Sequence, residues 1–178
     1  MDYLKNILKY KGEESRTISP ENPTGEKGKS CMEASDLGVG RKGRPLLPLN
    51  PNETVTIAEI EGPGIIRHMW FTITDKTTAG SFVLRDVIIR IYWDDCDYPS
   101  VECPIGDFFC NGFGTRCDIN SLPIVVNPTG GMNCYFEMPF RKKAKITITS
   151  EHPEYIKYFF YTINYVLVDE VSNDTLYF

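Results

Sequence analysis

Strict alternation of apolar and polar side chains, interrupted by glycine and proline, limits the folds open to this chain more than any other feature. Between Val87 and Trp93, for example, Ile89 and Ile91 fall on one side of an extended chain and Arg90 falls on the other. Alternate side chains of a β-strand point to opposite faces of a sheet. The sequence therefore predicts sheets that bury one face against a core.

Segments of this kind recur at short spacing from residue 54 onwards, and turns such as Glu61 to Gly64 separate them. In the segment 65–74, Ile65, Met69 and Phe71 are expected to share the core-facing side. Helical periodicity is absent after residue 12. Many short strands with almost no helix are typical of an all-β fold, here a jelly-roll-like β-sandwich. The predicted strands are 54–60, 65–74, 83–93, 100–103, 134–138, 144–150 and 156–168.

The first part of the chain differs from the rest. Residues 1–12 predict a short N-terminal helix, because the apolar residues between Tyr3 and Leu8 fall on one helical face. Residues 13–52 are rich in proline, glycine and charge and predict a long loop, which in compact domains is usually functional or disordered. With 53–178 as the β-sandwich, the 178 residues are expected to form a single domain.

Charge and cysteine usage narrow the possible partners. A net charge of −5 argues against nucleic acid, and no apolar run approaches the ~18 residues that span a bilayer. Without a recognisable secretion signal, the chain is expected to be cytoplasmic.

Six cysteines without a Cys-x-x-Cys pair predict reduced thiols, several of them in the core, and no metal or cofactor. Neither His68 nor His152 adjoins a nucleophile elbow, so a catalytic triad is not expected.

Five carboxylates lie between Arg90 and Gly114. The segment from Asp94 to Asp97 is expected to form a hairpin turn and not a calcium loop, because the glycine and glutamate of that motif are missing. Glu102 and Asp107 are a weak candidate pair for glycoside hydrolysis, which uses two carboxyl groups on either side of the scissile bond. The favoured alternative is that both are structural, with the neighbouring phenylalanines in the core.

Five longer motifs occur together in one order. They are Gly62-Pro-Gly-Ile-Ile-Arg-His-Met-Trp-Phe-Thr72, Arg90-Ile-Tyr-Trp-Asp94, Pro99-Ser-Val-Glu-Cys-Pro-Ile-Gly-Asp-Phe-Phe109, Ser121-Leu-Pro-Ile-Val-Val-Asn-Pro128 and Gly131-Met-Asn-Cys-Tyr-Phe136. Over roughly residues 15 to 170 the chain resembles the N-terminal half of glycoside hydrolase family 172, also called domain of unknown function 2961.

The resemblance implies two tandem jelly-roll-like sandwiches per protomer, assembled into trimers or hexamers. It also implies retaining hydrolysis or transfer at furanosides, as in difructose-anhydride and α-fructofuranosidase-type enzymes. The two catalytic glutamates of the family are expected in a second half, after Phe178, so no catalytic residue is carried over.

The resemblance further implies that the early loop lies near the sugar. Within it, Thr24-Gly25-Glu26-Lys27-Gly28-Lys29 departs from the Thr-Gly-Gly-Asn form typical of the family, which leaves the substrate open. The loop resembles a phosphate-binding loop only superficially, because its glycine spacing is too short. The candidate substrate-binding residues are Asn22, Thr24, Glu26, Lys27 and Lys29.

The leading hypothesis is the N-terminal jelly-roll domain of a furanoside-acting glycoside hydrolase that contributes assembly contacts and part of a sugar pocket and is not catalytic alone. Its expected partners are carbohydrate and either further copies, in a trimer or hexamer, or a C-terminal half-domain. The segment Thr175 to Phe178 is expected to be a strand that enters such a partner. The alternatives are a stand-alone oligomeric, capsid-like or carbohydrate-binding module and a minimal hydrolase that uses Glu102 and Asp107.

Overall fold

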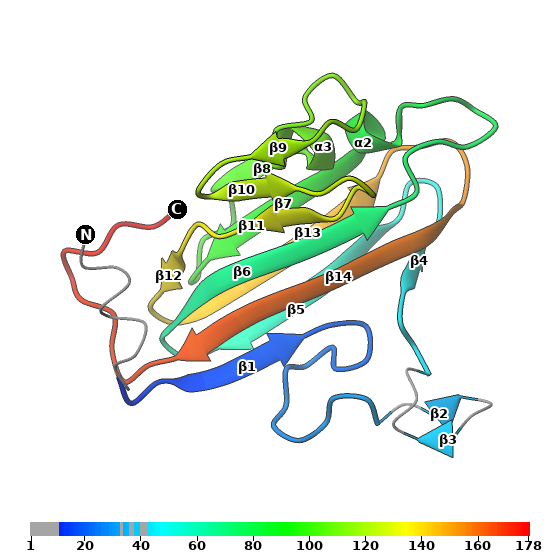
Figure 1. Cartoon of the computed structure of the whole chain (residues 1–178). Coiled ribbons are helices and arrows are strands. Elements are labelled where there is room, and N and C mark those ends of the chain that lie inside the picture. The colour runs from blue at the N-terminus through cyan, green and yellow to red at the C-terminus, as the bar shows by residue number, and fades with distance from the viewer. Residues whose placement is uncertain (1–10, 33, 36–37, 40–42) are drawn as a thin grey trace.

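A computed structural model describes residues 11–32, 34–35, 38–39 and 43–178, which form two antiparallel sheets stacked face to face (Figure 1). The smaller sheet contains, in spatial order, β5 (Thr54–Glu61), β13 (Lys143–Ser150), β7 (Val87–Trp93) and β8 (Val101–Pro104). The sequence-based prediction of an all-β sandwich is confirmed. The helix predicted over residues 1–12 lies, apart from its last two residues, outside the described part of the chain.

The larger sheet has eight strands. In spatial order, its main path is β1 (Glu14–Ile18), β14 (Ile156–Leu167), β6 (Gly64–Ile73), β11 (Met132–Cys134), β10 (Ile124–Val126) and β9 (Ile119–Asn120). In addition, β12 (Met138–Phe140) pairs with β6, and β4 (Leu47–Leu49) pairs with β14. A separate small hairpin joins β2 (Ala34–Ser35) to β3 (Gly38–Val39).

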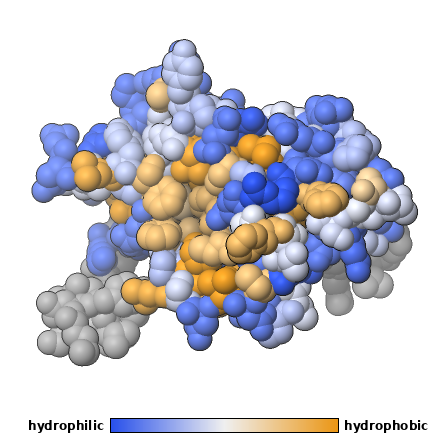
Figure 2. All heavy atoms as spheres, turned by 90° about the horizontal axis from the view of Figure 1, so that it is seen from above, coloured by the Kyte–Doolittle hydropathy of each residue, from blue (hydrophilic) through white to orange (hydrophobic). Residues whose placement is uncertain are grey.

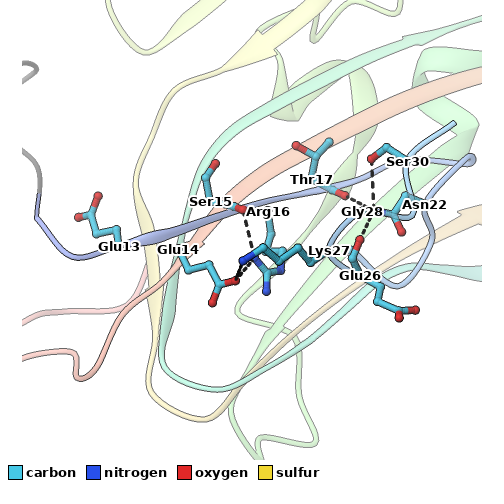
Figure 3. A pocket seen from close by; sticks show the side chains of 11 residues that line it. Glu13, Glu14, Ser15, Arg16, Thr17, Asn22, Glu26, Lys27, Gly28 and Ser30 are labelled. Atoms are coloured by element: carbon cyan, nitrogen blue, oxygen red, sulfur yellow. Dashed lines mark hydrogen bonds and ion pairs between the residues drawn. The ribbon is translucent and has the colours of Figure 1, made fainter.

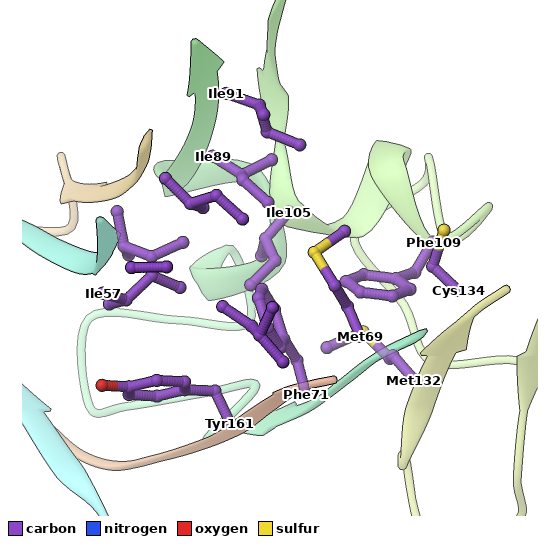
Figure 4. Close-up of a cluster of buried hydrophobic side chains, with 14 of the residues drawn as sticks. Ile57, Met69, Phe71, Ile89, Ile91, Ile105, Phe109, Met132, Cys134 and Tyr161 are labelled. Carbon is purple, nitrogen blue, oxygen red and sulfur yellow. The ribbon is translucent and has the colours of Figure 1, made fainter. Parts of the chain in front are cut away.

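The core lies between the two sheets and follows the alternation of the sequence (Figure 4). In β7 every second side chain is buried, and Ile89 and Ile91 have no exposed surface. Phe71 of β6 lies at the centre, with ring-centroid distances of 5.4 Å to Phe109 and 5.5 Å to Phe159. Edge-to-face contacts of this kind add to the stabilisation from burying apolar surface.

One prediction about β6 is wrong, and the cause is a β-bulge. His68 pairs with Asn164 and Ile66 pairs with Tyr165, so Arg67 is an extra residue in β6. Because side chains alternate with a period of two, one extra residue reverses the faces. As a result Ile66 is buried in the core beside Met69, whereas Ile65, predicted to be in the core, is only partly buried.

Three predicted segments have different boundaries in the structure. The first four residues of the predicted strand 83–93 form a helical turn, α2 (Val83–Asp86), which buries Leu84 against Gly106. The predicted strand 134–138 is divided, because residues 135–137 lie outside both β11 and β12. The predicted long loop 13–52 contains β1 to β4: β1 and β4 pair with β14, and β2 pairs with β3.

The described helices are short. Besides α2, only α3 (Ile105–Phe108) is helical, and each has four residues. No helix in the described part of the chain is long and apolar enough to cross a membrane.

The end of the chain folds back onto its own sandwich and does not form the strand predicted from Thr175 onwards. Trp93 Nε1 donates a hydrogen bond of 2.9 Å to the backbone carbonyl of Phe178. The Tyr177 hydroxyl donates to Asp94, and the Arg141 guanidinium lies over the Tyr177 ring. These contacts hold Tyr177 and Phe178 against the sandwich of the same molecule.

The cysteines are free thiols. The expectation that several are packed in the core is wrong, because only Cys134 is buried and Cys103 is partly buried. Burial raises the pKa of the Cys134 thiol to about 11. The exposed cysteines are Cys31, Cys96, Cys110 and Cys117.

Candidate functional site

The early loop, residues 19–31, folds against the edge of the larger sheet. Ser19 and Asn22 exchange backbone hydrogen bonds and close a tight turn. Gly25 has a φ of +66°, and a Cβ atom there would lie 2.4 Å from the Tyr165 hydroxyl oxygen. A glycine is therefore required at this position both for the backbone conformation and for the close approach to β14.

Asn22, one of the predicted substrate-binding residues, braces this loop. Its side chain is buried, and Nδ2 donates hydrogen bonds to the carbonyls of Thr17 and Glu26, at 3.2 and 3.1 Å (Figure 3). A weaker contact of 3.4 Å reaches the Ser30 hydroxyl. Because the amide nitrogen is used within the loop, Asn22 positions neighbouring residues.

A first cleft, of about 410 Å³, lies between β1 and the loop and contains three of the five predicted residues: Asn22, Glu26 and Lys27 (Figure 3). Lys27 Nζ lies 3.4 Å from a Glu14 carboxylate oxygen, which also contacts Arg16. Lys27 and Arg16 are therefore both engaged by the Glu14 carboxylate. The remaining two predicted residues, Thr24 and Lys29, are exposed and do not line it.

A second cleft, of about 160 Å³, lies where the same loop crosses β6 and β14, and we call it the Glu21 cleft. Both carboxylate oxygens of Glu21 are buried, and neither has a hydrogen-bond partner among the described residues. Burying a carboxylate without a partner costs several kcal/mol. The cleft is lined by Ser19, Pro20, Glu21, Ser30, Cys31, Pro45, Trp70, Phe160, Tyr161 and Thr162.

Strand pairing sets the position of the Trp70 side chain on the outer face of the larger sheet. Trp70 lies opposite Thr162 of β14 on one side and opposite Asn133 of β11 on the other. Gly131 leaves space for the indole, because a Cβ atom there would be 3.1 Å from Trp70 Nε1. Trp70 and Glu21 thus line the same small cleft.

A chain of hydrogen bonds runs along the outer face beside this cleft. The Thr17 hydroxyl donates to Asn164 Oδ1 at 2.8 Å, and Asn164 Nδ2 donates to His68 Nδ1 at 3.0 Å. His68 therefore carries its proton on Nε2, which donates to Asn133 Oδ1 at 3.1 Å. The imidazole also stacks on Tyr135, with ring centroids 4.7 Å apart. These contacts hold His68 in one orientation at the bulge.

The weak catalytic candidates Glu102 and Asp107 lie in two separate ion pairs. Glu102 of β8 accepts from Arg90 Nε at 2.8 Å, and the two residues are paired across β7 and β8. Asp107 of α3 binds Arg85 of α2. Each carboxylate is therefore paired with a different arginine. Both ion pairs join neighbouring elements of the fold, as expected of structural residues.

The acidic turn is confirmed as a hairpin turn. Asp94 has a φ of +54°, and Oδ1 accepts three backbone N–H groups, from Arg141 at 3.0 Å, Lys142 at 2.7 Å and Lys143 at 3.0 Å. Burial tends to raise the pKa of Asp94, but these bonds and the bond from Tyr177 outweigh it and hold the pKa below its usual value. Within the described ranges, no group of three or more acidic, cysteine and histidine residues is placed to hold a metal ion.

Sequence reasoning identified the loop but not the residues that form its most distinctive cleft. Glu21 adjoins the predicted residue Asn22 but is not among the predicted residues, and the sequence pattern indicates only a strand position for Trp70. One signal was present: Trp70 is a large aromatic residue on the polar-facing side of an alternating strand. Aromatic residues such as tryptophan are enriched in binding surfaces.

Together, the fold and the site define an antiparallel β-sandwich protein with a small cleft formed by a tryptophan and a carboxylate. The model of the GH172 domain-like family matches residues 45–160, nearly two thirds of the chain. The chain therefore belongs to this family of glycoside hydrolase domains, and the resemblance seen in its motifs is confirmed. The matched range includes Trp70 and Phe160. A search of the curated proteins finds no match.

Proposed function

We propose that this protein is a furanoside-acting member of its glycoside hydrolase family and that the Glu21 cleft binds one sugar unit. The observation that carries the proposal is the buried carboxylate of Glu21, which has no hydrogen-bond partner among the described residues and lies in the same cleft as Trp70. Sites that bind polar ligands hold such groups ready, because the ligand supplies the missing partners.

The chemistry of the cleft favours a neutral polyhydroxylated ligand. A carboxylate repels anions, whereas its two oxygens can accept up to about four hydrogen bonds from neighbouring hydroxyl groups. The indole of Trp70 offers an apolar face and one N–H donor. A sugar ring has both an apolar face and adjacent hydroxyls, so it matches both sides of the cleft.

We further propose that the sandwich acts beside a second sandwich, either a C-terminal half-domain or another copy in a trimer or hexamer. Seen from above, hydrophobic side chains gather near the middle of the molecule with polar residues around them (Figure 2). Exposed apolar residues of the segment 113–136 include Phe113, Leu122 and Phe136. Apolar surface of this kind is typical of contact regions. Sedimentation equilibrium measures the expected association, and a strictly monomeric chain at high concentration would contradict it.

The two tryptophans allow a direct test of the sugar site. Each indole N–H gives one signal in a two-dimensional ¹H–¹⁵N spectrum, and Trp93 serves as an internal control because its Nε1–H is already bound to the Phe178 carbonyl. We expect methyl β-D-fructofuranoside to shift the Trp70 signal in a saturable way and to leave the Trp93 signal in place. If neither signal moves at millimolar sugar, the proposed function is wrong.

Two glutamate variants test the role of the buried carboxylate. Glu21→Gln is expected to lower sugar affinity at least tenfold and, because it removes an unpaired buried charge, to raise the free energy of unfolding by about 1 kcal/mol. Glu26→Gln is the matched control, since Glu26 is exposed in the same loop. A loss of stability in Glu21→Gln, or equal loss of sugar binding in both variants, would show that Glu21 has a structural role.

A further inference from the structure

The second histidine of the chain, His152, lies between a carboxylate and a hydroxyl group. Its Nδ1 is 2.8 Å from Asp86 Oδ2, and its Nε2 is 2.6 Å from Thr77 Oγ1. Thr77 follows β6, Asp86 ends α2 and His152 follows β13. These three segments meet at one end of the sandwich (Figure 1), where Glu151 N donates a hydrogen bond of 2.8 Å to the Asp86 carbonyl. The fold thus brings together a hydroxyl, an imidazole and a carboxylate that are distant in the sequence.

The Asp86 carboxylate determines the direction of these hydrogen bonds. An ionised carboxylate only accepts, so a neutral His152 carries its proton on Nδ1 and donates it to Asp86. Nε2 is then an acceptor for the Thr77 hydroxyl. The backbone N–H of Ala79 donates to Thr77 Oγ1 at 3.2 Å, so this oxygen accepts one bond and gives its own proton to His152. An imidazole that is oriented by a carboxylate and accepts from a hydroxyl is the arrangement that activates the hydroxyl as a nucleophile.

Glu154 is a second acceptor beside this hydroxyl. Its carboxylate accepts from the Thr78 hydroxyl at 2.5 Å and from the Ala79 N–H at 3.1 Å. Hydrogen bonds from Thr78 and Thr77 lower the pKa of Glu154. If Thr77 gave its proton to Glu154, however, lone pairs of Thr77 Oγ1 and of a neutral His152 Nε2 would face each other at 2.6 Å. The bond to His152 is therefore favoured, and Glu154 holds the turn through Thr78 and Ala79.

The three side chains differ in their access to solvent. His152 is 1% exposed, whereas the Asp86 side chain is 30% exposed and Thr77 is partly exposed. Burial and two hydrogen bonds hold the imidazole in one orientation. A reagent from solvent can therefore reach the Thr77 hydroxyl while the imidazole stays in place behind it.

We propose that Thr77, His152 and Asp86 form a second reactive site, which accepts the acyl group of a small carboxylic ester. Thr77 Oγ1 forms a bond to the carbonyl carbon while its proton passes to His152 Nε2. The bond from that carbon to the alcohol oxygen then breaks, and the alcohol leaves with the proton. A water molecule, which gives a proton to the same imidazole, attacks the acyl-threonine, releases the carboxylic acid and restores the hydroxyl. Asp86 acts through His152 as a positioning residue.

This reaction is separate from the proposed sugar site, because none of the three residues lines the Glu21 cleft. The probe is p-nitrophenyl acetate: release of p-nitrophenol is followed by absorbance, and acid-quenched samples are mapped by peptide mass spectrometry. We expect saturable hydrolysis and an acetyl group on Thr77. Thr77→Ser retains the hydroxyl and should retain both results, whereas Thr77→Val should lose both. Thr78→Val is the matched control, because the Thr78 hydroxyl lies in the same turn and bonds to Glu154.

Three further variants separate the base from its neighbours. His152→Gln and Asp86→Asn should each lower the turnover rate at least about a hundredfold at unchanged KM, because general base catalysis contributes about 10²–10⁴-fold. Glu154→Gln should leave the turnover rate unchanged. Circular dichroism shows whether each variant is folded. If His152→Gln does not fold, the comparison of Thr77→Val with Thr77→Ser decides the role of the hydroxyl.

The opposite results are equally definite. If acetyl groups appear only on lysine or cysteine side chains, or if Thr77→Val hydrolyses the ester as fast as the unmodified chain, Thr77 is not a nucleophile. The three residues then only join neighbouring segments. If Glu154→Gln removes the activity and a folded His152→Gln retains it, the base is Glu154 and the proposed role of His152 is wrong. None of these outcomes changes the expected binding of sugar at the Glu21 cleft.

Discussion

Asp94 organises the junction of three segments, and its replacement gives the clearest test of the forces in this fold. Its carboxylate accepts three backbone N–H groups from residues 141–143 and the Tyr177 hydroxyl. The backbone of Asp94 is in the left-handed region, with a φ of +54°. We therefore expect Asp94→Ala to lose several bonds and to strain the turn.

The size of the stability loss in Asp94→Ala can be estimated from these contacts. Hydrogen bonds to a charged group contribute about 1.5–3 kcal/mol each when buried, and less at a partly exposed site such as this one. The left-handed conformation costs a non-glycine residue roughly 1–2 kcal/mol, and alanine bears more of that cost than aspartate, so the backbone adds about 1 kcal/mol or less to the difference. We expect Asp94→Ala to lower the free energy of unfolding by about 3–5 kcal/mol. Asp94→Asn retains an acceptor oxygen and tolerates this φ, so its expected cost is about 1–2 kcal/mol.

Urea unfolding followed by far-ultraviolet circular dichroism measures these differences. Asp95→Asn is the matched control: Asp95 forms an exposed ion pair with Lys142, and such pairs contribute little to stability because solvent screens them. If Asp95→Asn costs as much as Asp94→Asn, then general charge effects, and not the backbone bonds, stabilise the turn.

The contribution of Asp94 to the free energy of unfolding should decrease as the pH falls. The folded-state pKa of Asp94 lies below its usual value, so its contribution is fully present above the unfolded pKa of about 3.9 and is lost as the pH falls through the lower folded-state pKa. The stability difference between the unmodified chain and Asp94→Asn should therefore be constant near pH 7 and narrow below about pH 4. A difference that stays constant down to about pH 2 would refute the reasoning.

Two further predictions concern the loop and the core. Gly25→Ala should lower the free energy of unfolding by about 2–4 kcal/mol and abolish sugar binding, because the added methyl would lie 2.4 Å from the Tyr165 hydroxyl. Gly28→Ala is the control: Gly28 has a φ of +74°, but no atom lies within 4 Å of the added methyl. We expect it to lower the free energy of unfolding, measured by the same urea titration, only by the backbone strain of about 1 kcal/mol. Cys134, whose thiol pKa is raised to about 11 by burial, should resist iodoacetamide at pH 8 while the exposed cysteines react, as intact-mass spectrometry would show. Rapid modification of Cys134 in the folded chain would contradict its placement in the core.

The candidate site could be predicted only in part. The motifs and the loop composition pointed to residues 13–52, and three of the predicted residues line the first cleft. Glu21 was missed because nothing in a linear sequence shows that a carboxylate will be buried without a partner. That property depends on how the loop folds over Trp70, which lies far away along the chain.

The sequence by itself determined the class of the fold. Alternation in segments such as Val87–Trp93 is a local property of a strand, and apolar burial then requires two sheets to face each other. The turn at Asp94 could also be read locally, because its chemistry is that of aspartate in turns.

Only the tertiary structure decided which side chains reach each face and which of them meet. The extra residue at Arg67 reversed the faces of β6, and its presence depends on the pairing with β14. The cleft at Glu21 depends on the same pairing, since neighbouring strands bring together residues about 90 positions apart in the chain. Strand formation depends on local patterns, whereas register and loop packing depend on contacts between distant segments that the sequence does not encode locally.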